Sequence, residues 1–228
     1  VVANPKALGG FELQVETFKV LSSADVDLPV AVNQDPSHYS LETLLEHRII
    51  SLRNPKTLSI FRLQAEILRL FGDHFRAEDF TEIKSSKLIG SGTEGGTGLF
   101  AVDYFDRKVY LAQSPQLYKQ AMVASGLERV FEIGMAYRAE KHDTPRHINE
   151  YVSLDIETAF IESEHDLMDL EQRFLETLFV GIEQECGEVL GQWNAKVPST
   201  KAVRGIPRLS YEEALSVIAT VSGKKGYD

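Results

Sequence analysis

Side chains that could bind an anion gather in one short polar stretch near the middle of the chain. Two arginines and a histidine, Arg138, Arg146 and His147, lie within ten residues of one another. The planar arginine fork matches phosphate oxygens, and fixed cations stabilise the charge that develops on a transferring group. These residues indicate a polyphosphate site. The same arginines could instead pair with acidic neighbours such as Glu140 and Glu157 in a structural ion network, and spacing alone leaves both interpretations open.

Two apolar-rich runs flank this polar stretch and must position it. Apolar and polar residues alternate in the second run, in the order Val152, Ser153, Leu154, Asp155, Ile156 and Glu157. Period-two alternation puts successive side chains on opposite faces of a strand. We therefore expect an antiparallel hairpin with a long charged loop, one face of which meets a core while the other carries an acid-rich row.

A glycine-rich segment at residues 90–98 surrounds a single glutamate, Glu94. Glycine permits backbone angles that other residues avoid, so such a segment can approach a ligand closely. It lacks the GKS/T ending of a P-loop and the spacing of a dinucleotide fingerprint. It could be a mobile lid that delivers Glu94 to a ligand, or merely the flexible tip of a hairpin.

Residues 99–104 and 108–112 read as paired strands, and a helix is expected immediately after them. Ser114 is the expected N-cap, followed by Pro115 in the first helical position. In that helix Gln116 and Lys119 are three residues apart and share a face. Lys119 could be a ligand group at the end of a strand or an ordinary surface charge.

The remaining elements predict an α+β domain with a mainly antiparallel sheet flanked by helices. A short strand is expected at residues 80–83, and residues 193–206 read as a loop. Helices are expected at residues 41–48, at residues 57–75, after the Ser163-x-x-Asp166 capping box and after Ser210-x-x-Glu213.

Composition narrows the class of protein. The 228 residues are 43% hydrophobic, which is enough for a sizeable core. A formal charge of −10 argues against nucleic-acid binding through the overall field, although a local basic groove stays possible. The lone Cys186 fits a reducing compartment, and no apolar run is long enough to span a bilayer, so we expect a cytoplasmic protein without a membrane anchor. CxxC and HExxH patterns are absent and the histidines are scattered, so no metal site is predicted.

Several motifs together resemble the class II aminoacyl-tRNA synthetases, and within them the aspartyl-tRNA synthetases of the archaeal/eukaryotic-like type. Residues 131–140 and 146–157 resemble the second motif of that class. Three further stretches carry the narrower resemblance, namely GTEGG at 92–96, QSPQLYKQ at 113–120 and TPRHINE at 144–150.

The resemblance implies distinct roles for the residues of the hairpin. Arg138 would hold the ATP α-phosphate and the aspartate carboxylate and would stabilise the charge that builds during adenylation. Glu140 would contact the adenine amino group or its neighbourhood, and Tyr151 would stack on the adenine. Arg146 and His147 would bind the outer phosphates.

The resemblance also implies an amino-acid pocket. Glu94 would lie in a flipping loop and help to fix the substrate amino group, while Ser114, Gln116, Lys119 and Asp155 would line the pocket. An ammonium at position 119 would bind the β-carboxylate of aspartate strongly. It would bind the neutral amide of asparagine weakly, because the amide would leave the positive charge unpaired. Asparaginyl enzymes differ in the QSPQLYKQ region, so aspartate is the expected substrate.

The sequence departs from the family pattern in places. Ser86 stands where the first motif has its proline, Gly98 stands where a glutamate is usual, and Met135 replaces another proline. The chain also stops before the third motif, with its arginine for the γ-phosphate, and before the acidic Mg²⁺-binding segment. Residues 1–34 resemble the end of an OB-type anticodon-binding domain and its hinge. Residues 35–228 resemble a class II catalytic core that is incomplete at the C-terminus.

The family reaction is the ATP-dependent activation of aspartate to aspartyl-adenylate, followed by transfer to tRNA(Asp). ATP is then a substrate, Mg²⁺ an expected companion, and a homodimer is expected through the helix at 57–75. We expect the 228 residues by themselves to be a fragment that does not complete the reaction. Two alternatives stay open: a non-catalytic dimeric paralogue that senses aspartate or nucleotide, and an amide ligase related to asparagine synthetase.

Overall fold

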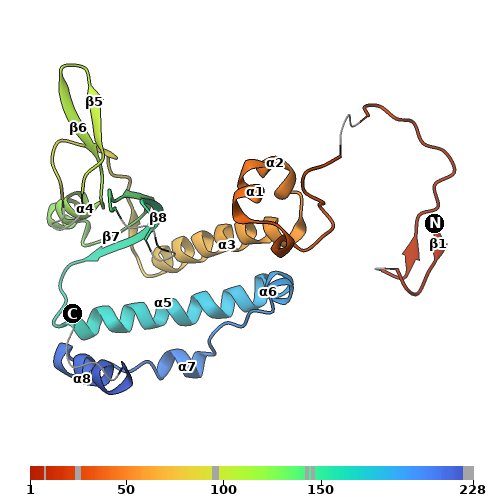
Figure 1. Cartoon of the computed structure of the whole chain (residues 1–228). Helices are drawn as coiled ribbons and strands as arrows, with labels where there is room; N and C mark the ends of the chain where they lie inside the picture. The colour runs from red at the N-terminus through yellow and green to blue at the C-terminus, as the bar shows by residue number, and fades with distance from the viewer. Residues whose placement is uncertain (8, 24–26, 94–97, 142–143, 145–146, 223–228) are drawn as a thin grey trace. The chain divides into compact units, whose positions relative to one another are not determined.

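The computed structural model describes residues 1–7, 9–23, 27–93, 98–141, 144 and 147–222, and it divides the chain into two compact units (Figure 1). The first unit is Val1–Thr57 and the second is Leu58–Asp228. Among the described residues, no helix is long and apolar enough to cross a membrane.

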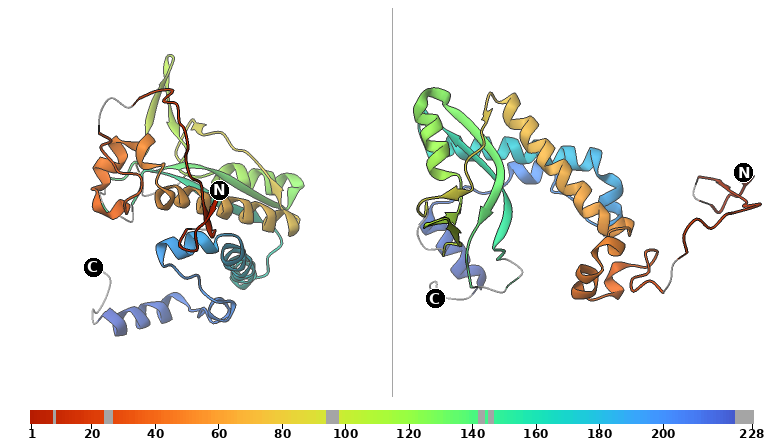
Figure 2. Two further views of the ribbon diagram at one scale, coloured as in Figure 1. Left: turned by 90° about the vertical axis from the view of Figure 1, so that its right-hand side faces the viewer. Right: turned by 90° about the horizontal axis from the view of Figure 1, so that it is seen from above.

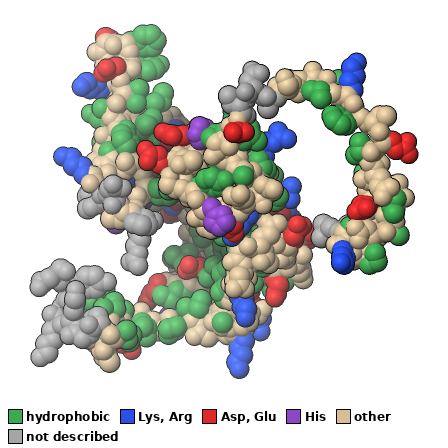
Figure 3. All heavy atoms as spheres, turned by 45° about the vertical axis from the view of Figure 1, so that its right-hand side comes forward, with side chains coloured by type: hydrophobic (Ala, Val, Ile, Leu, Met, Phe, Trp, Pro, Cys, Tyr) green, Lys and Arg blue, Asp and Glu red, His purple; other side chains and the backbone are tan. Residues whose placement is uncertain are grey.

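The first unit begins with a two-stranded antiparallel ladder of β1 (Val2–Ala3) and β2 (Phe11–Glu12). Large apolar side chains between residues 11 and 21 are exposed, as the extended segment of Figure 3 shows. Three short helical elements follow, namely η1 (Pro36–His38), α1 (Leu41–Glu46) and α2 (Arg48–Ser51). Ser40 caps α1 as predicted, because its hydroxyl accepts from the Thr43 N–H at 3.1 Å.

The single helix expected at 41–48 is wrong in one respect, because the backbone breaks at His47. His47 has φ −103° and ψ 42°, outside the helical region, and it separates α1 from α2. Its carbonyl then accepts from both Ile50 and Ser51, which starts the second helix. Apolar periodicity did not reveal this break because the residue types on both sides are helix formers.

The helix α3 (Pro55–Ala77) starts at the end of the first unit and confirms the helix predicted at 57–75. The second unit then contains β3 (Thr81–Glu82), β4 (Leu88–Ile89), β5 (Ala101–Tyr104), β6 (Arg107–Leu111), α4 (Gln116–Met122), η2 (Val123–Leu127), β7 (Arg129–Tyr137), β8 (Glu150–Thr158), α5 (Glu164–Glu185), α6 (Gly187–Trp193), α7 (Thr200–Arg204) and α8 (Tyr211–Ser222).

Two three-stranded sheets carry the architecture of the second unit (Figure 2). One has the order β3-β7-β8, with β7 and β8 paired antiparallel over their whole length and β3 parallel to β7. The other is antiparallel, in the order β4-β6-β5. The Tyr137 N–H donates to the Ala112 carbonyl at 2.9 Å, which joins the end of β7 to the chain just after β6. The predicted α+β class with a mainly antiparallel sheet and flanking helices is confirmed.

One face of the β7–β8 hairpin packs on helices, as the alternation predicts. Phe71 and Phe75 of α3, Phe131 of β7 and Leu170 of α5 form a buried cluster with Phe80. Ile133, Leu154 and Ile156 pack against it from the same face of the hairpin, and the Phe71 and Phe131 rings meet edge to face at 5.8 Å. The opposite face of the hairpin is the face that α4 approaches.

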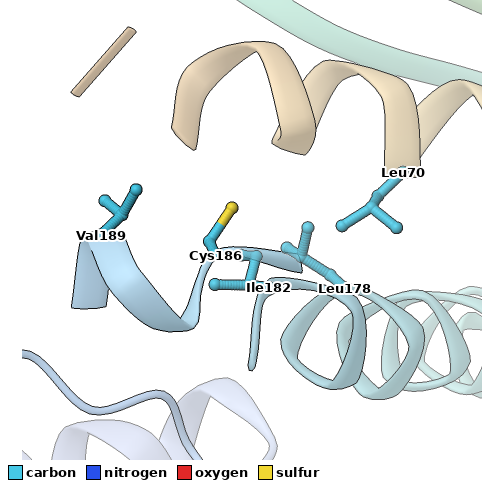
Figure 4. Packing of buried hydrophobic residues seen from close by; sticks show 5 residues of the cluster. All are labelled: Leu70, Leu178, Ile182, Cys186 and Val189. Carbon is cyan, nitrogen blue, oxygen red and sulfur yellow. The ribbon is translucent and has the colours of Figure 1, made fainter. Parts of the chain in front are cut away.

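A second apolar cluster fixes α5 against α3 (Figure 4). Leu70 of α3 meets Leu178 and Ile182 of α5, and Cys186 and the start of α6 extend the contact. Gly181 allows the close approach, because a Cβ at this position would lie 2.6 Å from a Leu70 methyl carbon. The two longest helices therefore pack together, and the hairpin packs on both of them.

The starts of α5 and α8 read from the sequence are confirmed, and one predicted loop is not. Ser163 and Asp166 form the predicted capping box of α5, and Ser210 with Glu213 caps α8. The expected loop at 193–206 is partly wrong, because it contains α7. Ser199 caps that short helix and Val203 anchors it at 1% exposure. Five helical residues are too few to produce a visible apolar period.

Candidate amino-acid and nucleotide site

The face of the hairpin that looks away from α3 and α5 carries the acidic row. In the strand register, Glu132 of β7 lies opposite Asp155 of β8, and Gly134 lies opposite Ser153. Tyr151 and Glu157 fall on the same face, since side chains two residues apart share a side of a strand. The helix α4 approaches this face, through contacts that end on Asp155 and its neighbours.

Lys119 of α4 is the cation that meets the acidic row. It is 9% exposed, and its ammonium lies 3.2 Å from Asp155 Oδ1 and 3.4 Å from Glu157 Oε2. The same nitrogen donates to the Ile156 carbonyl at 3.1 Å. The sequence left two interpretations of Lys119 open, and the one in which it is an ordinary surface charge is wrong. A buried ammonium held by two carboxylates has the chemistry of a carboxylate receptor, because an incoming anion could replace one of them.

The start of α4 lies at the end of β6 and is also buried. Ser114 is 8% exposed, and its hydroxyl accepts from the Gln116 N–H at 3.2 Å. The helix boundary falls one residue later than predicted, with Pro115 in the N-cap position and no side-chain cap there. Gln116 is half-buried one turn before Lys119, so the shared face predicted for this pair holds.

Gln113 is a site-forming residue that the sequence reasoning missed. It is completely buried, and its Oε1 accepts from the Thr93 N–H at 3.2 Å. At the other end of the glycine-rich segment, the Gly98 carbonyl accepts from the Ala139 N–H at 3.0 Å. Thr93 and Gly98 of that segment are therefore held beside the ends of β6 and β7. A buried amide in the QSPQ sequence was the available signal.

Two of the predicted site residues, Glu94 and Arg146, lie outside the described residues, so their contacts are not part of this geometry. The predicted roles of the glycine-rich segment, lid or hairpin tip, both stay predictions. The described part of the charged loop still places its two ends. Arg138 donates its N–H to the Asn149 carbonyl at 2.9 Å, which closes the base of the loop.

Arg138 and Tyr151 lie together at the end of the hairpin. Both are half-buried, and the guanidinium carbon lies 5.8 Å from the centre of the Tyr151 ring. A cation over an aromatic face is stabilised by the ring quadrupole. The pair thus combines a flat aromatic surface with a fixed positive charge.

Glu140 and His147 occupy the described remainder of the loop. Glu140 is half-buried, and its N–H donates to the Arg138 carbonyl at 2.9 Å. His147 is exposed, with Nδ1 2.6 Å from Thr144 Oγ1. With its amide turned so that its hydrogen bonds are satisfied, the Asn149 side chain donates to the carbonyls of Arg138 and Glu140. The loop base is therefore a compact hydrogen-bonded unit.

Glu132 is a second residue that the sequence reasoning missed. It is 2% exposed in the middle of β7, and it accepts from Ser85 and from the Lys87 ammonium. The local sequence provided little signal, because Glu132 is the one polar side chain among Val130, Glu132, Gly134 and Ala136, which lie across the register from the acidic row of β8. The acidic row thus spans both strands.

The candidate site brings a buried ammonium and its carboxylates together with an aromatic and cationic surface, where α4 meets the β7–β8 hairpin. Lys119, Asp155 and the buried Ser114 define the first part, and Arg138 with Tyr151 defines the second. Within the residues that the structure describes, no three His, Cys, Asp or Glu side chains cluster as metal ligands would. The arrangement suits a small molecule with a carboxylate and an ammonium beside a second ligand with a flat ring and phosphates.

Comparison with known proteins identifies the family of the chain. Residues 40–226 match the sequence profile of the tRNA synthetases class II (D, K and N). The Aspartate–tRNA(Asp/Asn) ligase of Deinococcus radiodurans is 43% identical over 98% of this chain and 51% of its own length. The Aspartate–tRNA(Asp) ligase of Pyrococcus horikoshii is 41% identical over 95% of this chain and 49% of its own. The chain spans about half the length of the curated relatives it matches.

Solved structures give the same answer for the fold. The asparaginyl-tRNA synthetase of Pyrococcus horikoshii, complexed with asparaginyl-adenylate, superposes with a TM-score of 0.83 at 27% identity, over 99% of this chain and 51% of that one. The aspartyl tRNA synthetase from Entamoeba histolytica gives a TM-score of 0.71 at 27% identity, over 90% of this chain and 43% of that one. The chain therefore belongs to the class II tRNA synthetases of the D, K and N group.

Proposed function

We propose that the protein containing these residues is an aspartate–tRNA ligase, which activates aspartate with ATP and transfers it to tRNA(Asp). The single observation that carries this proposal is the buried Lys119 ammonium between Asp155 and Glu157, on the face shared with Tyr151. The curated relatives named above as aspartate–tRNA ligases support the same substrate.

In this proposal Lys119 selects the amino acid. The β-carboxylate of aspartate would take the place of one carboxylate on the ammonium, so the charge remains paired when the ligand is bound. The neutral amide of asparagine cannot do so, and a buried charge with an inferior partner is costly. Ser114, Gln116 and Asp155 would contact the rest of the amino acid, with Asp155 available to its ammonium.

The ATP would lie at the end of the hairpin. Tyr151 offers a ring on which the adenine can stack, and Glu140 would contact the adenine amino group. Arg138 would bridge the α-phosphate and the substrate carboxylate, holding the attacking oxygen near phosphorus and stabilising the charge that forms there. We assign outer-phosphate binding to Arg146 and His147, and the substrate amino group to Glu94. Mg²⁺ would accompany ATP, and no described residue is assigned to it.

The proposal extends to assembly and compartment. We propose a homodimer through α3, which exposes Ile60 and Phe61 on the second unit. The protein would work in the cytoplasm, where a lone buried cysteine stays reduced. Light scattering on the purified chain tests the dimer, and a monomer at micromolar concentration would contradict it.

Two measurements test the reaction. Calorimetry on this chain should show aspartate binding more tightly than asparagine by at least about tenfold, the value of one well-placed charge. Aspartate-dependent exchange of pyrophosphate into ATP should occur with the complete reading frame that encodes these residues, and we expect no robust exchange from the 228 residues alone. Equal affinity for the two amino acids, or exchange supported by asparagine, would refute the assignment. Ammonia-dependent formation of asparagine would instead identify an amide ligase.

A further inference from the structure

The second buried carboxylate of the hairpin has its own lysine. Glu132 Oε1 accepts from the Ser85 N–H at 2.9 Å and lies 3.1 Å from the Lys87 ammonium, and Oε2 accepts from the Ser85 hydroxyl at 2.6 Å. The Lys87 ammonium also donates to Ser85 Oγ at 2.9 Å. An ionised carboxylate at 2% exposure is costly unless it is paired and hydrogen-bonded, and this arrangement meets both conditions.

The chain keeps space for this pair. Gly134 follows Glu132 on the same face, and a Cβ there would lie 2.9 Å from the Lys87 nitrogen and 3.0 Å from Glu132 Oε1. Any side chain at position 134 would push the ammonium away from the carboxylate. Glycine at this strand position therefore allows the close approach of Lys87, although glycine has a weaker strand propensity than most residues.

The pair lies next to the amino-acid receptor. Glu132 is directly opposite Asp155 in the register, and Asp155 contacts Lys119. In the described part of this face, three carboxylates thus meet two lysines, with Lys87 on Glu132 and Lys119 on Asp155 and Glu157. Opposite residues in an antiparallel pair have Cβ atoms only about 5 Å apart, so an unneutralised Glu132 would repel Asp155 and attract the Lys119 ammonium.

We propose that Lys87 is a positioning residue of the amino-acid site, which neutralises Glu132 and so leaves the Lys119 ammonium to Asp155, Glu157 and an incoming carboxylate. The role in ligand binding rests on the proposed function of the site. The electrostatic coupling between Lys87 and Lys119 does not rest on it, because that coupling is a property of the ligand-free protein.

A double-mutant comparison tests the coupling. Lys87→Met leaves Glu132 buried without its cation, whereas Lys87→Met with Glu132→Gln removes both charges and keeps an acceptor for Ser85. In the ligand-free chain labelled with [¹⁵N]lysine, the side-chain ammonium signal of Lys119, assigned by its loss in Lys119→Met, should move in the single variant and return in the double. Lys84→Met is the matched control, since Lys84 lies in the same segment with its ammonium on the Ile133 carbonyl and on Glu82.

Calorimetry with aspartate tests the consequence. Lys87→Met should weaken aspartate binding by about tenfold, while the double variant and Lys84→Met should stay within about threefold of the wild type. A double variant as weak as Lys87→Met would overturn the proposal, because Lys87 would then act on the ligand or through its shape. An unmoved Lys119 signal in Lys87→Met would overturn it as well.

Two further outcomes keep the test decisive. If Lys87→Met does not fold by circular dichroism, Glu132→Gln serves beside the double variant, since it leaves the Lys87 ammonium without its carboxylate. The Lys119 signal should then move in Glu132→Gln and return in the double variant, and an unmoved signal in Glu132→Gln would overturn the proposal. If the wild type binds no aspartate, the proposed function fails, and the ammonium signals still decide whether Lys87 positions Lys119.

Discussion

Replacing Lys119 with methionine gives the sharpest test of how this site is built. The substitution keeps an unbranched side chain of similar length and removes the ammonium that contacts three oxygens, on Asp155, Glu157 and the Ile156 carbonyl. Leaving one partner of a fully buried ion pair uncompensated costs about 3–5 kcal/mol. The Asp155 and Glu157 side chains are 17% and 26% exposed, so water relieves part of that cost. We expect a loss of about 1–3 kcal/mol in the free energy of unfolding.

Under the proposed function, the same variant should lose the preference for aspartate. A hydrogen bond to a charged group contributes about 1.5–3 kcal/mol, which corresponds to a fall in aspartate affinity of about 10- to 150-fold. Asparagine should be affected less, so the ratio of the two dissociation constants should approach one. Urea unfolding and calorimetry measure the two effects, with Lys108→Met on the exposed part of β6 as the control. If Lys119→Met matches that control in both assays, the carboxylate-receptor interpretation is wrong.

Three other perturbations test the support beneath the site. Gly181→Ala should be less stable than the matched Gly191→Ala by about 1–3 kcal/mol, because the added Cβ meets Leu70 at 2.6 Å whereas position 191 has open space, and equal melting temperatures would contradict the packing. Burial lowers the pKa of His74 below its usual value of 6.5, so the folded state resists protonation. The free energy of unfolding should therefore fall as the pH drops below 6.5, because the unfolded state then binds the proton more readily. His74→Phe should weaken this pH dependence, as measured by urea unfolding at pH 7.5 and 5.5. Ser163→Ala removes half of the α5 capping box and should cost about 1 kcal/mol, and an unchanged urea midpoint would show that the cap contributes nothing.

The parts of the fold that were predictable are those in which one short segment contains its own physical signal. The α5 capping box needs only Ser163 and Asp166 three residues apart, and the core face of β8 needs only alternating side chains. The long apolar stripe of α3 likewise determines which of its sides is buried, and the structure places Phe71 and Phe75 there. In contrast, the break at His47 depends on a single backbone conformation, which residue types on either side do not encode.

The residues of the candidate site were likewise predictable only where the local sequence contains the signal. Lys119 could be suspected from its position after a strand end, but a lysine there could as well have been exposed, and only the approach of α4 to β8 buries it at 9% exposure. Glu132 is harder still, because its partners Ser85 and Lys87 lie 47 and 45 residues away along the chain. The local sequence of β7 does not indicate that Ser85 and Lys87 are these partners.

The register of the hairpin is what joins the two lysines into one site. Pairing β7 with β8 one residue out of step would place Glu132 on the apolar face, where a carboxylate without a partner is far more costly than an exchange of strand contacts. The acidic face therefore specifies the register as strongly as the phenylalanine face does. Because the same register brings Glu132 opposite Asp155, the charge balance of the proposed amino-acid site and the correct pairing of the hairpin depend on one set of residues. A change that releases Lys87 should consequently weaken ligand binding more than it destabilises the sheet. Its effect should therefore be larger in an affinity measurement than in a melting curve.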